Sequence, residues 1–127
     1  EDRTIPVYGD GRNVRDWLHV EDHALGVYLA LTEGKTGEVY NFGGFGEKRN
    51  IEVAELLAKA FGKSLKQAVT FVEDSKGHDW RYSMDPTKVQ RELGWKPRWD
   101  LGEGFESTIQ WYRDHQDWWR PKLPQRN

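Results

Sequence analysis

Apolar residues recur at helical spacings of three and four positions in four segments of the chain. Acidic or amide side chains stand at the starts of these segments, and glycines follow the first three of them. The third segment is the most clearly bounded, since Asp85 and Pro86 suit its start and Gly94 suits its end. The pattern therefore predicts four helices, over residues 21–32, 50–61, 86–93 and 100–112.

Short runs of branched and aromatic residues separate these segments and predict strands at 6–8, 14–20, 39–42 and 69–72. In the last of these runs Val69 and Phe71 are expected to share one face. Strands that alternate with helices predict a single small α/β domain over residues 1–127. The segment 116–127 has tryptophans and prolines among polar residues and is expected to be an irregular tail, which either folds back or offers a contact surface.

Composition narrows the range of partners. The chain has 127 residues, a formal charge of -2 and no cysteine, and its isoelectric point is near 6.1. This charge gives no basic footprint for nucleic acid or for an anionic membrane. No apolar run is long enough for a transmembrane helix. From these features we expect a soluble, cytoplasmic protein without disulfides.

The segment between the last predicted strand and the third helix carries the most chemistry. Residues 76–82 read K-G-H-D-W-R-Y, with several kinds of hydrogen-bond donor beside a flexible glycine. That set suits the binding of a small molecule that carries phosphate, and the alternative is an ordinary polar loop. His19 and His23 have a spacing seen in zinc sites, with Asp22 as a further ligand. Packing or capping is expected instead, because His19 falls in a predicted strand and His23 in a helix.

These motifs resemble those of the extended short-chain dehydrogenase/reductase family. Its carboxy-terminal half contains a G-H-D-x-R-Y loop followed by a D-x-x-K-x-x-x-x-L-G-W-x-P helix, and this chain has both, at 77–82 and 85–97. His78 within the loop is typical of the dTDP-glucose 4,6-dehydratase branch. The resemblance runs from about Ile5 to Tyr112. It implies the small substrate-binding lobe of an NAD-dependent epimerase or dehydratase, without the Rossmann half.

The resemblance also implies binding roles near the amino terminus. The stretch from Pro6 to Asp22 is similar to a family block in which an arginine, here Arg15, reaches the diphosphate of a nucleotide sugar. Pro6 and Tyr8 would lie near the base of that ligand. An arginine suits this task because its planar fork pairs with two phosphate oxygens. The alternative is an exposed strand arginine that is paired with Asp16 or another carboxylate.

Three further residues complete the implied site. Asn50 would contact the nucleotide sugar, although capping of the second helix alone explains an asparagine there. His78 would donate to a phosphate oxygen. The branch has a second arginine two residues before the loop glycine, where this chain has Ser75, so we expect weak binding or a shifted pose that uses Lys76.

The residues that hold NAD in this family are missing from the sequence. It has no G-x-x-G-x-x-G turn and no Tyr-x-x-x-Lys pair, and the glycines at 43, 44 and 46 lack the spacing of a dinucleotide-binding fingerprint. We therefore expect neither a cofactor site nor a catalytic set in this chain. The start at Glu1, without methionine and close to a family motif, is expected of a fragment or of a free-standing product of the half-domain.

Three functional hypotheses follow. The first is a nucleotide-sugar-binding portion of a dehydratase that is not catalytically complete alone. The second is a non-enzymatic module that forms homo-oligomers and has a decayed site. The third is an enzyme whose cofactor half is on a separate chain. Because the family fold would cover apolar faces that this chain leaves open, we also expect a homodimer.

Overall fold

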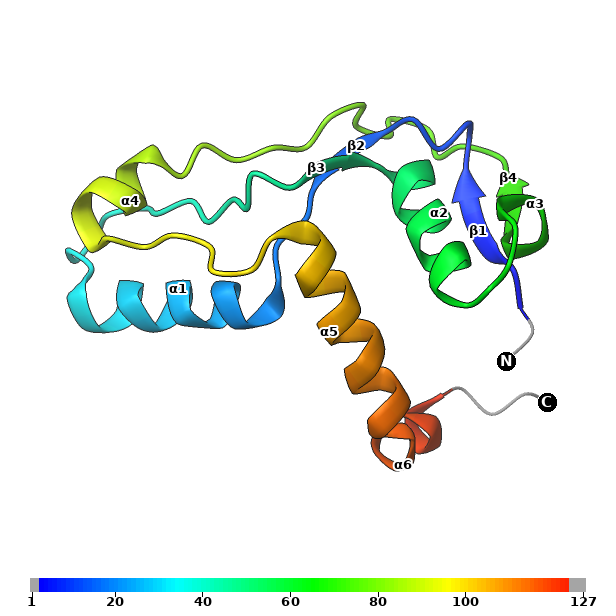
Figure 1. The fold of residues 1–127 in the computed structure, drawn as a ribbon. Coiled ribbons are helices and arrows are strands. Elements are labelled where there is room, and N and C mark those ends of the chain that lie inside the picture. Colours follow the sequence, from blue (N-terminus) through cyan, green and yellow to red (C-terminus); the bar gives the residue numbers. More distant parts are fainter. Residues whose placement is uncertain (1–2, 124–127) are drawn as a thin grey trace.

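The computed structural model describes residues 3–123, in which helices and short strands are joined by long extended segments. Figure 1 shows β1, β4, α2 and α3 together at one end of the molecule and α1 with α4 at the other. The strands are β1 (Ile5–Tyr8), β2 (Val14–Asp16), β3 (Glu47–Arg49) and β4 (Val69–Val72). The helices are α1 (Val20–Glu33), α2 (Asn50–Ala60), α3 (Leu65–Ala68), α4 (Thr87–Leu93), α5 (Leu101–Asp114) and α6 (Gln116–Trp119), followed by the 3-10 turn η1 (Arg120–Lys122).

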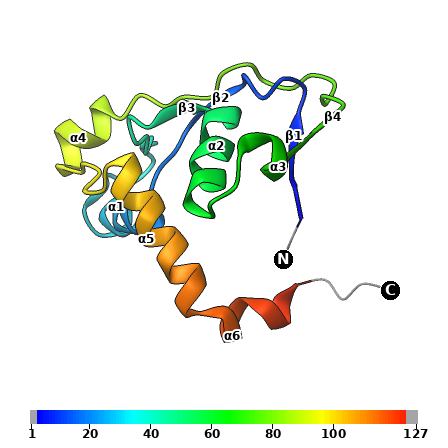
Figure 2. The same ribbon diagram turned by 45° about the vertical axis from the view of Figure 1, so that its right-hand side comes forward.

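The first end of the molecule has a small apolar core. Strands β1 and β4 pair in parallel, with Ile5 opposite Val69 and Val7 opposite Phe71. Helices α2 and α3 cover this pair, as the turned view in Figure 2 also shows. The buried side chains come from all four elements: Val7, Ala54, Ala58, Ala68 and Val69. Val69 is buried, whereas Phe71, predicted to share its face, is 56% exposed.

The middle of the molecule joins three segments that are distant in sequence. Strands β2 and β3 pair antiparallel, with Arg15 opposite Lys48. On the other side of β2, the Val14 backbone donates to the Trp80 carbonyl at 2.8 Å and accepts from the Tyr82 amide at 3.0 Å. The G-H-D-x-R-Y loop is therefore fixed alongside β2.

The other end is organised around a buried carboxylate on α1. Asp22 is fully buried and accepts from the backbone amides of Arg98 and Trp99, at 3.0 and 3.1 Å, and from Arg98 Nε at 3.3 Å. Trp95, 1% exposed, donates from Nε1 to the Asp22 carbonyl at 2.9 Å. The ring of Phe42 packs edge-on against Trp95, with 5.2 Å between centroids. These contacts attach the segment after α4 to α1.

Two of the strand predictions are wrong in part or in full. The strand predicted at 14–20 ends at Asp16, and α1 begins at Val20 with His19 as its N-cap residue. The segment 39–42 is not a strand. No strand of residues 3–123 pairs with it, and the Val39 carbonyl accepts instead from Lys88 Nζ at 2.8 Å. The strand that pairs with β2 is β3, whose charged sequence E-K-R gave no strand signal.

Three smaller predictions also need correction. Asn50 is the first residue of α2 rather than its cap, and the N-cap residue is Arg49, whose amide donates to Glu52 Oε2 at 2.8 Å. The short helix α3 was not predicted. The tail is not irregular over 116–122, where α6 and η1 fold back on α5, and Trp119 Nε1 donates to the Tyr112 carbonyl at 2.7 Å. Residues 124–127 lie outside the described part.

Helix α1 presents an apolar stripe to solvent. Asp22 and Gly26 face the rest of the molecule, and a Cβ added to Gly26 would lie 2.5 Å from the Phe42 ring. The opposite side carries exposed apolar residues at helical spacing: Val20, Val27, Tyr28 and Leu31, the last 83% exposed. We call these four residues the α1 stripe. Within residues 3–123, no helix is long and apolar enough to cross a membrane.

Candidate binding site around Arg15

Arg15 and His78 are in direct contact, although 63 positions separate them. Arg15 lies on β2, and the loop fixed alongside that strand brings His78 to it. One Arg15 Nη2 hydrogen bond reaches His78 Nε2 at 2.8 Å and another reaches the Asp79 carbonyl at 3.0 Å, while Nη1 donates to the Val14 carbonyl at 2.7 Å. His78 Nδ1 lies 2.6 Å from Asp74 Oδ1. The predicted pair of Arg15 and His78 thus comes together in one cluster.

The positive charge of Arg15 is not balanced by a carboxylate. In residues 3–123 its partners are two carbonyl oxygens and a histidine nitrogen, and it forms no ion pair. The alternative of an arginine paired with Asp16 is therefore wrong. Asp16 accepts instead from the amides of Gly44 and Gly46, both at 3.2 Å. A half-buried arginine without a counter-charge is a good ligand for an anion.

The hydrogen bonds define the proton positions on His78. A guanidinium has only donors, so the His78 Nε2 atom must accept from Arg15. The proton of the neutral imidazole is then on Nδ1, which donates to Asp74. The hydrogen bond from His78 is the main cause that lowers the pKa of the Asp74 carboxyl below its ordinary value. In this state His78 holds Arg15 and has no proton on Nε2 to give to a phosphate.

The other predicted site residues lie at different distances from this cluster. The Tyr8 ring stands edge-on to His78, with 6.4 Å between centroids, whereas Pro6 is an exposed strand residue two positions earlier. The backbone amide of Asn50 donates to the backbone carbonyl of Asn13 at 3.0 Å, which ties α2 to the turn before β2. Lys76 is exposed at a tight turn and forms no ion pair within residues 3–123.

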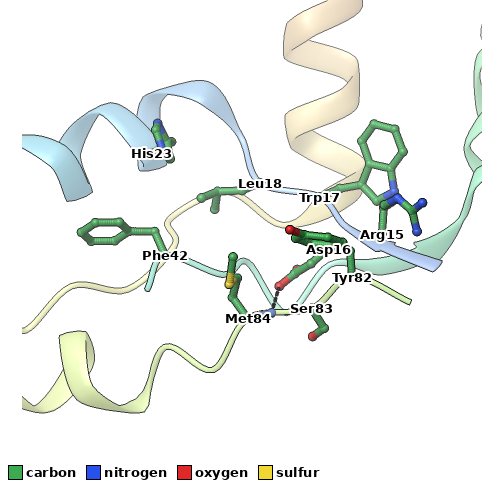
Figure 3. A pocket seen from close by; sticks show the side chains of 9 residues that line it. All are labelled: Arg15, Asp16, Trp17, Leu18, His23, Phe42, Tyr82, Ser83 and Met84. Atoms are coloured by element: carbon green, nitrogen blue, oxygen red, sulfur yellow. Dashed lines mark hydrogen bonds between the residues drawn. The ribbon is translucent and has the colours of Figure 1, made fainter. Parts of the chain in front are cut away.

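A cavity of about 410 Å³ begins at Arg15. Figure 3 shows Arg15 at one end of it, His23 and Phe42 at the other, and Asp16, Tyr82 and Met84 between them. Its walls are mainly aromatic and apolar, since Trp17, Leu18, Phe42, Tyr82 and Met84 line it. The Asp16 carboxylate in the wall already accepts from two backbone amides. Such a volume is within the range of small-molecule sites.

A second arginine of the loop has a structural role. Arg81 forms a two-point ion pair with Glu47 of β3, and Ser83 Oγ donates to the same carboxylate at 2.7 Å. The hydrogen bond from Arg81 is the main cause that lowers the pKa of Glu47, and the bond from Ser83 adds to it. The hydrogen bond to Glu47 in turn raises the pKa of Arg81. Arg81 therefore braces the loop against β3 and is not available to a ligand.

Sequence reasoning missed two residues of the site. Asn13 is buried, and its Nδ2 donates to the Asp79 carbonyl at 3.2 Å, the same oxygen that Arg15 contacts. Nothing in the turn composition around Asn13 distinguishes it. Asp74 is four positions before His78, a spacing that could have indicated the pair.

The histidines near α1 have packing and capping contacts. His19 Nδ1 accepts from the Glu21 amide at 3.3 Å, and its ring lies 4.6 Å from that of Trp99. His23 stands edge-on to Phe42, with 6.3 Å between centroids. Within residues 3–123, no group of three or more metal-binding side chains comes together.

The glycine-rich segment after 42 does not form a phosphate cradle. A cradle needs free backbone amides. Those of Gly44 and Gly46 donate to Asp16, and an added Cβ on either glycine would lie within 2.6 Å of the Trp17 carbonyl oxygen. These glycines allow the segment to pack closely on β2. They do not fit the pyrophosphate of NAD.

A model of the GDP-mannose 4,6-dehydratase family matches residues 1–108. The chain belongs to this family. The dTDP-glucose 4,6-dehydratase of Actinoplanes sp. is 51% identical over 115 residues, which are 91% of this chain and 36% of that protein. The predicted relationship to the extended short-chain dehydrogenases, and among them to dTDP-glucose 4,6-dehydratase, is thereby confirmed.

Solved structures of similar proteins share the fold. The dTDP-glucose 4,6-dehydratase of Bacillus anthracis, in complex with NAD, has a TM-score of 0.85 and 44% identity over 94% of this chain and 37% of its own. The UDP-glucose 4-epimerase of Thermotoga maritima, with UDP-glucose, has a TM-score of 0.80 and 28% identity over 91% of this chain and 36% of its own. The predicted small α/β fold is confirmed. The chain spans about a third of the length of these relatives.

Proposed function

We propose that this chain is the nucleotide-sugar-binding portion of a dTDP-glucose 4,6-dehydratase-like protein, specific for a dTDP- or UDP-sugar and not catalytically complete alone. The observation that carries the proposal is the half-buried Arg15, which has no carboxylate partner in residues 3–123. A guanidinium has five N–H donors, and three are used inside the chain, so two remain for phosphate oxygens.

The surroundings of Arg15 support a ligand with both a charged and a ring-shaped part. The cavity that begins at Arg15 is lined by Trp17, Phe42 and other apolar side chains. Aromatic walls next to one cation suit a sugar or base ring that is joined to a diphosphate. The UDP-glucose carried by the Thermotoga relative belongs to this class of ligand.

Two features set the strength expected of this site. Ser75 stands where the resemblance places a second arginine, whose fork could pair with two phosphate oxygens, and Lys76 is a flexible point charge. The loss of one charged hydrogen-bonding partner costs about 1.5 to 3 kcal/mol, or roughly ten- to a hundredfold in affinity. Weak binding is therefore expected, or a shifted pose with Lys76 as a secondary contact.

The proposal is tested by titrating the purified chain with dTDP, UDP and their glucose esters while following tryptophan fluorescence. Trp17 and Trp80 are each two residues from a member of the cluster, Arg15 or His78. Saturable quenching is expected, and Arg15→Ala should weaken it roughly ten- to a hundredfold because it removes the unpaired cation.

Arg12→Ala is the matched control for this titration. Arg12 is three positions away, exposed, and already paired with Asp10 at 3.5 Å. The Arg12→Ala chain should bind the nucleotides with the affinity of the unchanged chain. Equal affinities of the Arg15 and Arg12 variants, or no response up to millimolar ligand from a folded chain, would refute the proposed site.

A second function, as a non-enzymatic assembly module, is favoured by the α1 stripe. Four apolar side chains stand exposed on one helix face, which is uncommon for a surface helix. We propose that a second copy of the chain covers this stripe. A separate chain that holds NAD is the other possible partner, and the family's dehydratase activity would then require that partner.

Light scattering at tens of micromolar tests self-association. The mass of a dimer is expected, and Leu31→Lys should shift it toward a monomer because a charge would be buried in the interface. Leu56→Lys places the same change on an exposed leucine of α2 and should leave the dimer intact. A monomeric unchanged chain would contradict the homodimer.

A further inference from the structure

The cluster contains a carboxylate, Asp74, which contacts His78 although its own side chain is 45% exposed. Asp74 follows β4 and lies beside Gly9, the residue after β1. Its Oδ1 atom accepts from His78 Nδ1 at 2.6 Å and from the Ser75 amide at 2.9 Å. Gly9 has a positive φ of 57°, and a Cβ there would lie 2.9 Å from Asp74 Oδ2. The end of β1 therefore leaves room for the Asp74 carboxylate.

We infer that Asp74 is a positioning residue of the anion site: it fixes the Nδ1-protonated tautomer of His78, and His78 in turn holds the Arg15 guanidinium. This inference rests on the proposed function of Arg15. Asp74 Oδ1 lies 2.6 Å from His78 Nδ1, and on the other side of the ring His78 Nε2 lies 2.8 Å from Arg15 Nη2.

The direction of each hydrogen bond gives the physical reason. An ionised carboxylate accepts only and a guanidinium donates only, so the imidazole between them must donate from Nδ1 and accept at Nε2. Without Asp74 the Nδ1 proton loses its acceptor in residues 3–123, and only the contact of Nε2 with Arg15 still favours this tautomer. A proton on Nε2 would then face the Arg15 N–H, and the guanidinium would lose one of its three anchors.

Orientation of Arg15 matters because phosphate recognition depends on where its two unused N–H groups point. An arginine that is already held loses less conformational freedom when the ligand binds. Asp74 itself needs no contact with the ligand. Its removal should act on affinity through the rotamer of Arg15.

The first readout is the ¹⁵N chemical shifts of the His78 ring in the ligand-free chain, at a pH where the ring is neutral. The Nδ1-protonated form is expected in the unchanged chain and in Asp74→Asn, which keeps an acceptor oxygen. Asp74→Ala should move the signal toward the Nε2-protonated form. An unchanged tautomer in Asp74→Ala would overturn the inference, whether or not any nucleotide binds.

The second readout is the affinity for dTDP and UDP. Asp74→Ala should weaken binding about three- to tenfold, and Asp74→Asn should restore most of that loss. Glu73→Ala is the matched control, since it removes the neighbouring exposed carboxylate with the same change of charge. Equal effects of the Asp74 and Glu73 variants would show a role of net charge only and would overturn the inference.

A double variant separates positioning from other effects. In an Arg15→Ala chain, Asp74→Ala should cause no further loss of affinity, because its effect passes through Arg15. A full additional loss would overturn the inference. Circular dichroism of each variant confirms that it is folded. If the unchanged chain binds no nucleotide while the tautomer shift is seen, the proposed function fails and the contact between Asp74 and His78 stands.

Discussion

Trp95→Ala is expected to lower the free energy of unfolding by about 3 to 5 kcal/mol, the range for removal of a large buried aromatic side chain. Trp95 is 1% exposed, packs against Phe42 and donates a hydrogen bond to α1. Its loss leaves a cavity and removes a hydrogen bond that attaches this segment to α1. Urea unfolding followed by far-UV circular dichroism measures the change.

Trp80→Ala provides the control for this experiment. Trp80 is 61% exposed, and its hydrogen bond to Val14 uses the backbone carbonyl, which the substitution keeps. Its unfolding free energy should stay within about 0.5 kcal/mol of that of the unchanged chain. Similar urea midpoints for the two tryptophan variants would contradict the central packing role of Trp95.

Asp22→Ala is expected to cost about 3 kcal/mol of stability, since it leaves three N–H donors of Arg98 and Trp99 without their acceptor. Asp22→Asn retains one acceptor oxygen, so its free energy of unfolding should lie between those of Asp22→Ala and the unchanged chain. The same unfolding measurement applies. The segment 95–99 should then separate from α1, which faster amide hydrogen exchange at Trp99 would show.

The control for Asp22 lies on the same helix. Glu33 is exposed at the end of α1, so Glu33→Ala changes the charge equally without removing a buried acceptor. It should be close to neutral. If both variants lost the same stability, the effect would come from net charge, and the anchoring role of Asp22 would be refuted.

Helices were predictable because their signals are local. Asp100 caps α5 by accepting from the Glu103 amide at 2.9 Å, and Gly94 ends α4 with a φ of 64°, as their residue types indicated. Strands were less predictable because their partners are distant. The charged segment β3 becomes a strand only through β2, and the apolar segment 39–42 fails to become one without a partner in residues 3–123.

The site was predictable only in its outline. Resemblance to the family indicated Arg15 and His78, and the structure places them in contact. It did not reveal that, within residues 3–123, Arg15 lacks a carboxylate partner while Arg81 has one in Glu47. That difference depends on which strand lies opposite each arginine, and spacing along the chain contains no such information.

The 63-residue separation of Arg15 and His78 has a consequence for how this protein can be assayed. Neither segment alone has the geometry of the pair, because the contact requires β2, β3 and residues 80–82 to have assembled. Closing a loop of this length is a late and entropically costly event in folding. Nucleotide affinity should therefore disappear together with the global fold, so that a bound fluorescent nucleotide would report the native fraction in a denaturant titration.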